Sequence, residues 1–113
     1  MKKFLALVLA MLMVFSLCAC GNGGDSGEKV VKIGVFEPLT GDSAAGGKQE
    51  VLGMQYANSK VPTVEIGGET YKVELVYSDN GSDSAKAVSA ASKLVNEKVS
   101  LVLGSYGSGV SIA

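Results

Sequence analysis

The chain has a clear candidate for a buried β-strand in the stretch Val30-Val31-Lys32-Ile33-Gly34-Val35-Phe36. A β-branched apolar run with a single Lys is typical of a strand that is covered on both faces, as in a parallel sheet. A turn-rich loop follows over residues 37–47, which contain Pro38 and several glycines. Apolar side chains then recur at helical spacing around Val51 and Met54, and this spacing predicts a helix over residues 48–59.

Two further strands and a hairpin are predicted after this helix. Residues 63–66 and 70–77 alternate between apolar and polar side chains, and Gly67-Gly68 stands between them. That arrangement predicts a β-hairpin whose second arm is long enough to be the second main strand. Residues 99–103, Val-Ser-Leu-Val-Leu, predict the third main strand.

A second helix is predicted over residues 85–97, between the second and third main strands. Its N-cap is Ser82, Asp83 or Ser84, because short polar side chains accept hydrogen bonds from the first free N–H groups of a helix. The spacing of its apolar residues places one face toward the sheet. That predicted inner face consists of Val88, Ala91, Leu94 and Val95. The Gly-rich segment 104–109 follows the third strand, and residues 110–113 begin a third helix.

This β-α-β-α-β order predicts the α/β class, with an open parallel sheet and right-handed crossovers. In such sheets ligands bind beyond the carboxyl ends of the strands, where the strand order reverses. If the first strand lies between the second and third main strands, the loops at 37–47 and 104–109 face a single cleft. The sequence therefore places the candidate binding site between these two loops.

Composition argues against several classes of function. The net charge is −1, and the basic residues form no cluster, so a nucleic-acid partner is not expected. The chain has no His, no Arg and no recognisable nucleophile–base pair, so we do not expect an enzyme. Asp79, Asp83 and Glu50 are interpreted as loop and cap residues, and no metal or cofactor is predicted.

The two Gly-rich loops also match nucleotide-binding motifs poorly. Residues 41–49 resemble a P-loop, but an extra Gly shifts Lys48, and Gln49 stands where the motif needs a hydroxyl for Mg²⁺. The glycines of residues 104–109 have the wrong order for the dinucleotide-binding fingerprint, and they follow the third strand instead of the first. Neither loop is therefore assigned to a nucleotide.

The N-terminus has the pattern of a secretory signal peptide, which we assign to residues 1–19. Lys2 and Lys3 precede an uncharged apolar run over residues 4–17, which is shorter than the about 20 residues that span a bilayer. Residues 20–29 are small and polar and predict a flexible tether. Only residues 30–113 remain for a folded unit, which is less than a typical domain, so we expect them to be part of a larger one.

The stretch Leu17-Cys18-Ala19-Cys20 resembles the lipobox of bacterial lipoproteins. The resemblance implies cleavage after Ala19, a diacylglycerol on the sulfur of Cys20, and a protein held at the outer face of the cytoplasmic membrane by its acyl chains. The alternative is ordinary signal cleavage that leaves two free thiols. Two cysteines separated by one residue are badly placed for a disulfide between them.

Several segments in order resemble the leucine/isoleucine/valine-binding proteins, which are type I periplasmic binding proteins of amino-acid ABC importers. They are residues 32–41, 47–53, 73–80, 85–96 and 99–104. The resemblance implies two α/β lobes that close on a ligand, of which residues 30–113 are part of the N-terminal lobe. It implies an amino acid as ligand and ABC permease subunits as partners. A sensory receptor is the alternative, although a cleaved lipoprotein signal argues against it.

The resemblance also implies the ligand contacts. The Ser108 hydroxyl and the main-chain N–H groups near Ser108 and Gly109 bind the ligand's α-carboxylate, while Tyr106 and Gly107 line the same wall. The alternative is a strand-to-helix turn in which Ser108 is only the N-cap. One position departs from the family, because leucine-binding members have an aromatic residue where this chain has Gly46. That change removes an apolar wall, so a preference for leucine does not follow.

Overall fold

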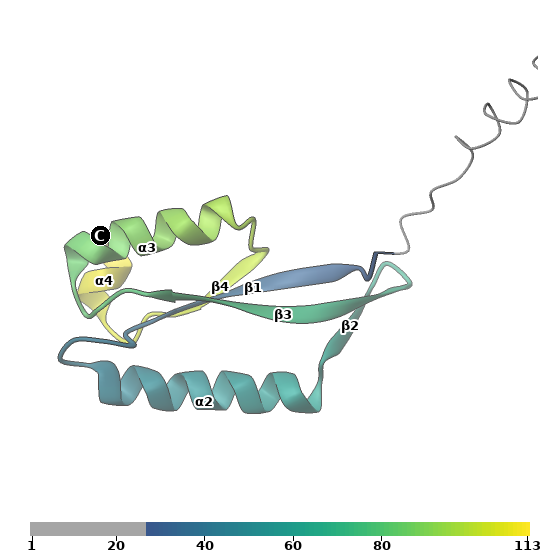
Figure 1. Ribbon diagram of the computed structural model, residues 1–113, viewed down its shortest axis with the longest axis horizontal. Helices are drawn as coiled ribbons and strands as arrows, with labels where there is room; N and C mark the ends of the chain where they lie inside the picture. The colour runs from purple at the N-terminus through teal and green to yellow at the C-terminus, as the bar shows by residue number, and fades with distance from the viewer. Residues whose placement is uncertain (1–26) are drawn as a thin grey trace, which may run out of the picture.

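The computed structural model describes residues 27–113, so the predicted signal peptide, Cys20 and most of the predicted tether lie outside the described residues. Strands and helices alternate as predicted, with one extra short strand before the second main strand (Figure 1). The elements are β1 (Val30–Glu37), α2 (Ala44–Lys60), β2 (Thr63–Ile66), β3 (Glu69–Asp79), α3 (Ser84–Asn96), β4 (Leu101–Gly104) and α4 (Ser108–Ile112).

The strands form one open sheet in the order β2-β3-β1-β4. β1 pairs in parallel with β3 on one side and with β4 on the other, which confirms the α/β class and fulfils the condition on which the single cleft depended. β2 pairs antiparallel with β3, with Thr63 opposite Lys72 and Ile66 opposite Glu69, which confirms the hairpin. The strand order therefore reverses between β1 and β4, where the sequence placed the candidate site.

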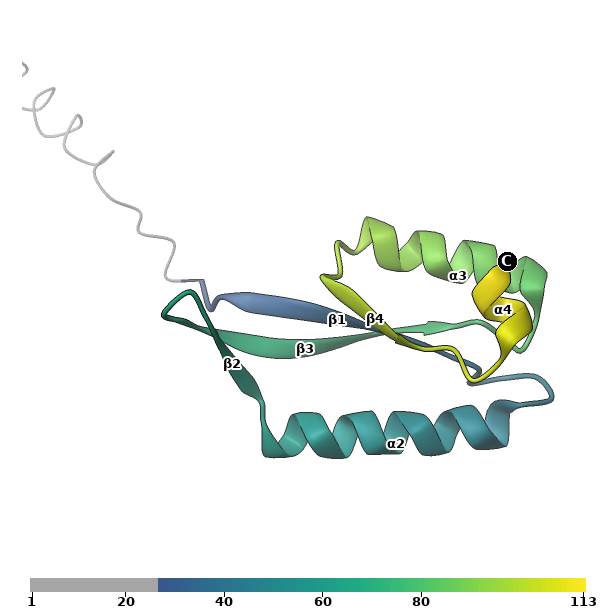
Figure 2. The same cartoon turned by 180° about the vertical axis from the view of Figure 1, so that it is seen from behind.

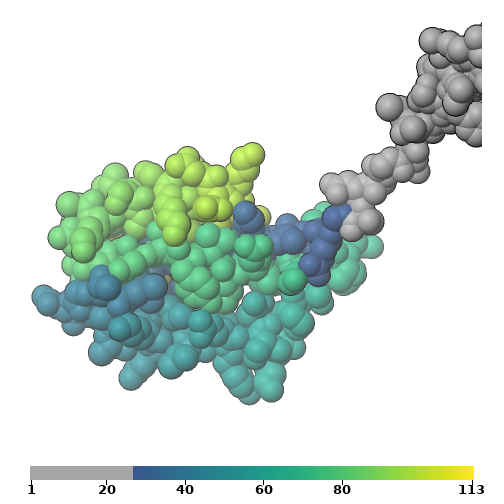
Figure 3. All heavy atoms as spheres, in the orientation of Figure 1, coloured from purple at the N-terminus to yellow at the C-terminus, as the bar shows by residue number. Residues whose placement is uncertain are grey.

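Helices cover both faces of this sheet. α2 lies on one face, and α3 and α4 lie on the other (Figures 1 and 2), so that the two helical layers are on opposite sides in the space-filling view (Figure 3). The main core lies between the sheet and the α3–α4 layer, where Phe36 of β1 packs against helical side chains. Its buried members are Phe36, Ala87, Ala90, Leu94 and Val110.

Helix α2 begins at Ala44, earlier than the predicted residue 48, so the loop before it is shorter than predicted. Gly46 and Gly47 disfavour a helix by intrinsic propensity, and this was the reason for predicting a loop. In the fold, a Cβ atom at position 47 would lie 2.3 Å from the carbonyl oxygen of Pro38. The helix thus starts in close contact with the loop after β1, and this tertiary contact outweighs the weak propensity.

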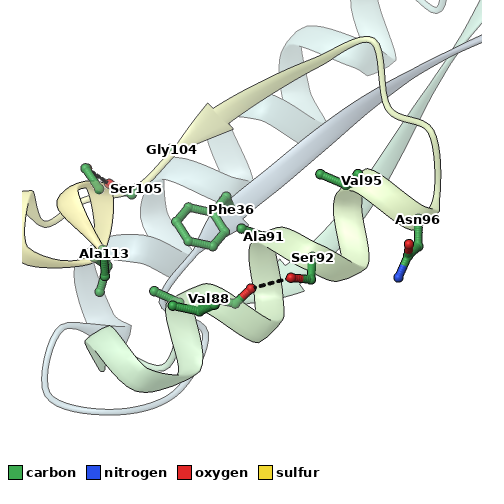
Figure 4. Close-up of a pocket in the computed structure, with 12 residues that line it drawn as sticks. Phe36, Val88, Ala91, Ser92, Val95, Asn96, Gly104, Ser105 and Ala113 are labelled. Atoms are coloured by element: carbon green, nitrogen blue, oxygen red, sulfur yellow. Dashed lines mark hydrogen bonds between the residues drawn. The ribbon is translucent and has the colours of Figure 1, made fainter.

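The predicted inner face of α3 is wrong except for Leu94. The buried residues of α3 are Ala87, Ala90 and Leu94, whereas Val88 and Val95 are 54% and 74% exposed. The two sets lie on adjacent sides of the helix, and the small side chains of Ala87 and Ala90 let α3 approach the sheet closely. Val88, Ala91 and Val95 instead border an open apolar groove beside α4 (Figure 4).

Candidate functional site

Three loops meet at the carboxyl edge of the sheet. They follow β1, β3 and β4, and the register places Glu37 beside Asp79 and Phe36 beside Gly104 at the strand ends. A hollow of about 130 Å³ lies among these loops. Its lining is mostly small and polar: Pro38, Ser43, Asn80, Ser82, Ser84, Ser105, Gly107, Gly109 and Val110. The predicted cleft between the first and third loops therefore also receives residues from the loop after β3.

Asn80 joins the three strand ends. Its side chain is fully buried, and its Nδ2 donates to the carbonyl oxygens of Phe36 at 3.3 Å and Ser105 at 3.2 Å. Its Oδ1 accepts a hydrogen bond from the Ser82 N–H at 3.0 Å. The carbonyls of β1 and of the β4 loop are thereby held together by one side chain. Asn80 was not predicted as a functional residue, although a polar residue directly after a parallel strand is a signal for this edge.

Asp79 fixes the loop after β1. Its Oδ1 accepts hydrogen bonds from the N–H groups of Leu39 at 2.7 Å and Gly81 at 2.8 Å, and its Oδ2 accepts one from the Thr40 hydroxyl at 2.6 Å. Desolvation by burial raises the pKa of Asp79, but these bonds to the carboxylate outweigh it and lower the pKa to about 2. Asp79 is the last residue of β3 and not a loop residue as interpreted, but its carboxylate holds the loops that follow β1 and β3.

Asp83 is the N-cap of α3, which confirms one of the three predicted caps. Its carboxylate accepts hydrogen bonds from the N–H groups of Ala85 at 2.8 Å and Lys86 at 3.0 Å. These bonds lower the pKa of Asp83, because they favour its charged form. Glu50 does not fit the same interpretation, since it lies within α2 and is neither a loop nor a cap residue.

Glu37 is a buried carboxyl group at the end of β1. It is fully buried, and neither of its carboxylate oxygens accepts a hydrogen bond from the residues that the structure describes. Its neighbour is the carboxyl of Glu50, which can bond to it only when one of the two is protonated. Burial, followed by this neighbour, raises the pKa of Glu37 to about 7. Glu37 was predicted to be a loop residue without a role, whereas it is the last residue of β1.

The predicted ligand residues follow β4 directly. Gly107 is the N-cap of α4 and Ser108 its first residue, so the alternative in which Ser108 is the N-cap is wrong. Ser108 is exposed, and its hydroxyl forms no hydrogen bond with any residue in 27–113. Gly107 and Gly109 line the polar hollow, whereas Tyr106 lies outside its lining and is 51% exposed. Of the four predicted residues, Gly107 and Gly109 thus line the hollow, and Ser108 and Tyr106 are not part of its lining.

Ser105 holds the segment that carries these residues. It is 8% exposed, and its hydroxyl donates to the carbonyl oxygen of Gly107 at 3.1 Å and contacts the Ser111 hydroxyl. Ser111 also donates to the Gly107 carbonyl at 3.1 Å. The carbonyl oxygen of Gly107 therefore accepts hydrogen bonds from two hydroxyl groups. The side chain of Ser108 takes no part in these bonds and is exposed.

Two larger hollows have a different character. A groove of about 580 Å³ runs between α3 and α4 beside Phe36, and Figure 4 shows Val88, Ala91 and Val95 along it. A second, of about 640 Å³, lies between α2, the hairpin and the edge strand β4. No charged side chain lines either one. The lining of the second is apolar except for Asn58, whereas Ser92, Asn96, Ser105 and Ser111 add polar groups to the first.

The cleft is lined by groups that form hydrogen bonds. Within residues 27–113 no three His, Cys, Asp or Glu side chains gather where they could ligate a metal ion. None of the helices described here is both long and apolar enough to cross a membrane. The groups at the cleft are hydroxyls, main-chain N–H groups and one amide, which form hydrogen bonds to small polar molecules.

Known proteins resemble the chain in both sequence and fold. The model of a family described as periplasmic binding protein matches residues 30–113. The Leu/Ile/Val-binding protein homolog 2 of Brucella abortus (strain 2308) is 35% identical over 96 residues, which cover 85% of this chain and 26% of that protein. The chain thus spans about a quarter of the length of this relative.

Two solved structures share the fold. The leucine-binding protein LivK of Thermotoga maritima MSB8 is 38% identical with a TM-score of 0.66, covering 74% of this chain and 23% of that one. The branched-chain amino acid transporter substrate-binding protein LivJ of Streptococcus pneumoniae, solved with isoleucine, is 34% identical with a TM-score of 0.62, covering 74% and 24%. Because the family model covers nearly all of the described residues and the solved relatives share the fold, the chain belongs to the type I periplasmic binding proteins.

Proposed function

We propose that the chain belongs to the extracytoplasmic substrate-binding component of an ABC importer for amino acids, branched-chain or similar. The family membership and the names of the relatives support the transport role. The observation that supports an amino acid as the ligand is the Ser108 hydroxyl at the start of α4, which forms no hydrogen bond with the described residues. Ser108 stands between Gly107 and Gly109, which line the polar hollow. ABC permease subunits are the proposed partners.

In this proposal the ligand's α-carboxylate binds at the segment 106–109. Ser108 donates its hydroxyl, and the first N–H groups of α4, which have no carbonyl partner inside the helix, donate beside it. Gly107 and Gly109 have no side chains, so an anion can approach these main-chain donors. Asn80 and Asp79 do not contact the ligand; they hold the three loops that surround it.

The test is Ser108→Ala in the full-length natural protein, with binding measured by calorimetry. We expect a loss of roughly 1.5–3 kcal/mol in binding free energy, the scale of a hydrogen bond to a charged group. Ser89→Ala is the control, because Ser89 is exposed on α3 and bonds only to the Lys86 carbonyl. Unchanged affinity of Ser108→Ala, or a preference for sugars over amino acids in a thermal-shift screen, would contradict the carboxylate assignment.

The second part of the proposal is a lipid anchor on Cys20, which lies outside the described residues. It rests on the sequence pattern at residues 17–20 and on the extracytoplasmic location that the family implies. Acyl chains on one cysteine would hold the soluble lobes at the outer face of the cytoplasmic membrane, near the permease.

A further inference from the structure

The strands β1 and β4 separate where the candidate cleft begins. Their last paired residues are Phe36 and Gly104. Gly104 has a φ of 134°, in the region that favours glycine, and a Cβ atom built there would lie 2.1 Å from the carbonyl oxygen of Phe36. The chain therefore passes close to β1 at Gly104 and then leaves the sheet (Figure 4). Beyond this point strand pairing no longer fixes the distance between β1 and residues 105–109.

One side chain bridges the gap between the separated strands. The fully buried Asn80 donates hydrogen bonds from Nδ2 to the carbonyl oxygen of Phe36 at 3.3 Å and to that of Ser105 at 3.2 Å. An amide nitrogen has two hydrogens to donate, whereas a hydroxyl has one and a carboxylate has none. The link between β1 and the turn after β4 thus depends on the amide group of Asn80 and not only on its shape.

Asn80 is itself held by the strands and loops on its other side. Its Oδ1 accepts a hydrogen bond from the N–H of Ser82 at 3.0 Å, and its main-chain N–H donates to the carbonyl oxygen of Glu37 at 3.2 Å. The loops after β1 and β3 also pack closely, because a Cβ atom at Gly41 would lie 2.2 Å from the carbonyl oxygen of Gly81. These contacts leave Asn80 little freedom, so its two donated bonds fix the turn after β4 relative to β1.

The turn that Asn80 holds continues directly into the proposed carboxylate site. The hydroxyl of Ser105 donates to the carbonyl oxygen of Gly107 at 3.1 Å, and Gly107 precedes Ser108. Asn80, Ser105 and Gly107 line the same hollow. A series of hydrogen bonds thus runs from β1 through Asn80 and Ser105 to the residue before Ser108. A displacement of Ser105 therefore moves the donors of the proposed site.

We propose that Asn80 is a positioning residue for ligand binding, which sets the distance between β1 and residues 105–109 and keeps the carboxylate donors in one place. The inference rests on the proposed function and deepens it, because it adds a residue that acts on the ligand only through Ser105. Without the amide, residues 105–109 occupy several positions, and only a fraction of the molecules is competent to bind. A competent fraction of about one tenth raises the apparent Kd about tenfold.

The experiment measures the Kd for L-leucine and for L-valine by calorimetry in variants of the full-length natural protein, well below their thermal midpoints. Asn80→Ala removes the bridge. Asn80→Asp keeps the shape and the bond from Ser82, but its carboxylate has no hydrogen to donate. Both variants weaken binding by about tenfold. The factor is the same for the two ligands, because the bridge acts at the carboxylate end that they share.

Ser78→Ala is the matched control for lost stability. Ser78 is buried two residues before Asn80, and its hydroxyl donates to the carbonyl oxygen of Ala90 in α3 at 2.9 Å. It is the same kind of bond, from a buried side chain to a main-chain carbonyl, but neither Ser78 nor Ala90 lines the hollow. Ser78→Ala therefore lowers the thermal midpoint and leaves both Kd values unchanged.

Ser105→Ala tests the same series of bonds without changing the buried amide, because it removes only the hydroxyl that reaches Gly107. It weakens binding of both ligands. Asn80 has only a structural role, and the proposed function stands, if the folded Asn80 variants bind as tightly as the wild type or Ser78→Ala loses as much affinity as they do. The same holds if the Asn80 variants fail to fold and Ser105→Ala keeps the wild-type Kd. If the wild type binds none of the common amino acids, the proposed function itself is overturned.

Discussion

Glu37 is the residue whose charge state most affects the folded lobe. An acid whose pKa is higher in the folded than in the unfolded chain binds more protons when folded, so stability falls as pH rises between the two values. For Glu37 that window extends from about 4.5 to about 7. Its cause is burial without a donor, and Glu50 adds a second carboxyl beside it.

Glu37→Gln should therefore stabilise the protein above pH 7 by on the order of 2–3 kcal/mol and remove most of the slope between pH 4.5 and 7. The measurement is chemical unfolding of the full-length natural protein at several pH values. Glu74→Gln, at an exposed position of β3, serves as the control and should keep the wild-type profile. Parallel profiles for wild type and Glu37→Gln would show that Glu37 is ionised in the fold and has a cationic partner.

Cys20 is the residue on which the proposed membrane location depends. Cys20→Ala should abolish labelling with a palmitate analogue and release the protein from membranes, because only the acyl chains hold it there. Cys18→Ala is the matched control two residues away, and it should leave labelling and fractionation unchanged. A Cys20→Ala protein that remains in the membrane fraction would refute the lipid anchor.

Among the elements, α3 depends most clearly on its cap. The Asp83 carboxylate satisfies two N–H groups of the first turn, and this helix supplies three of the five buried residues of the main core. Asp83→Ala leaves both N–H groups without their partner, and we expect a lower thermal midpoint with unchanged ligand specificity.

The measurement is thermal unfolding of the full-length natural protein. Asp83→Asn should keep most of the stability, because its Oδ1 can still accept both bonds. Asp42→Ala, on an exposed loop residue with no hydrogen bond among the described residues, is the control. Equal midpoints for Asp83→Ala and wild type would mean that packing alone holds α3 in place.

For the molecule as a whole, the exposed apolar surface is the dominant feature. β4 lies at the edge of the sheet, and Leu101, Val102 and Leu103 are 48%, 51% and 38% exposed. The α3–α4 groove and the groove beside α2 add further apolar surface. An open edge strand with apolar side chains favours association with other chains, and so little burial leaves a small margin of stability.

We therefore expect residues 21–113, expressed alone, neither to unfold cooperatively nor to bind amino acids. Thermal unfolding and amide hydrogen exchange, with and without L-leucine, provide the measurement. Fast exchange across β4 together with slower exchange in β1 would locate the weak edge. A cooperative transition that shifts with ligand would refute the expectation and show that this unit is self-sufficient.

The sequence by itself determined the element order, the parallel α/β class, the hairpin and the edge of the sheet that carries the candidate site, whereas the strand order came from the structure. These follow from local periodicity and from the handedness of β-α-β connections, which act along the chain. Family resemblance then directed attention to residues 106–109. Only the tertiary structure decided which face of α3 is buried, where α2 begins, and that Asn80 and Glu37 stand at the strand ends.

The contact between Gly46 and Tyr106 shows most clearly why the tertiary structure was needed. The sequence predicted that this chain lacks an apolar wall at position 46, because glycine has no side chain and the leucine-binding members have an aromatic residue there. In the fold, the ring of Tyr106 occupies the space above it, although the two residues are 60 positions apart. Packing between loops of distant sequence depends on strand order and register, and no local pattern encodes it.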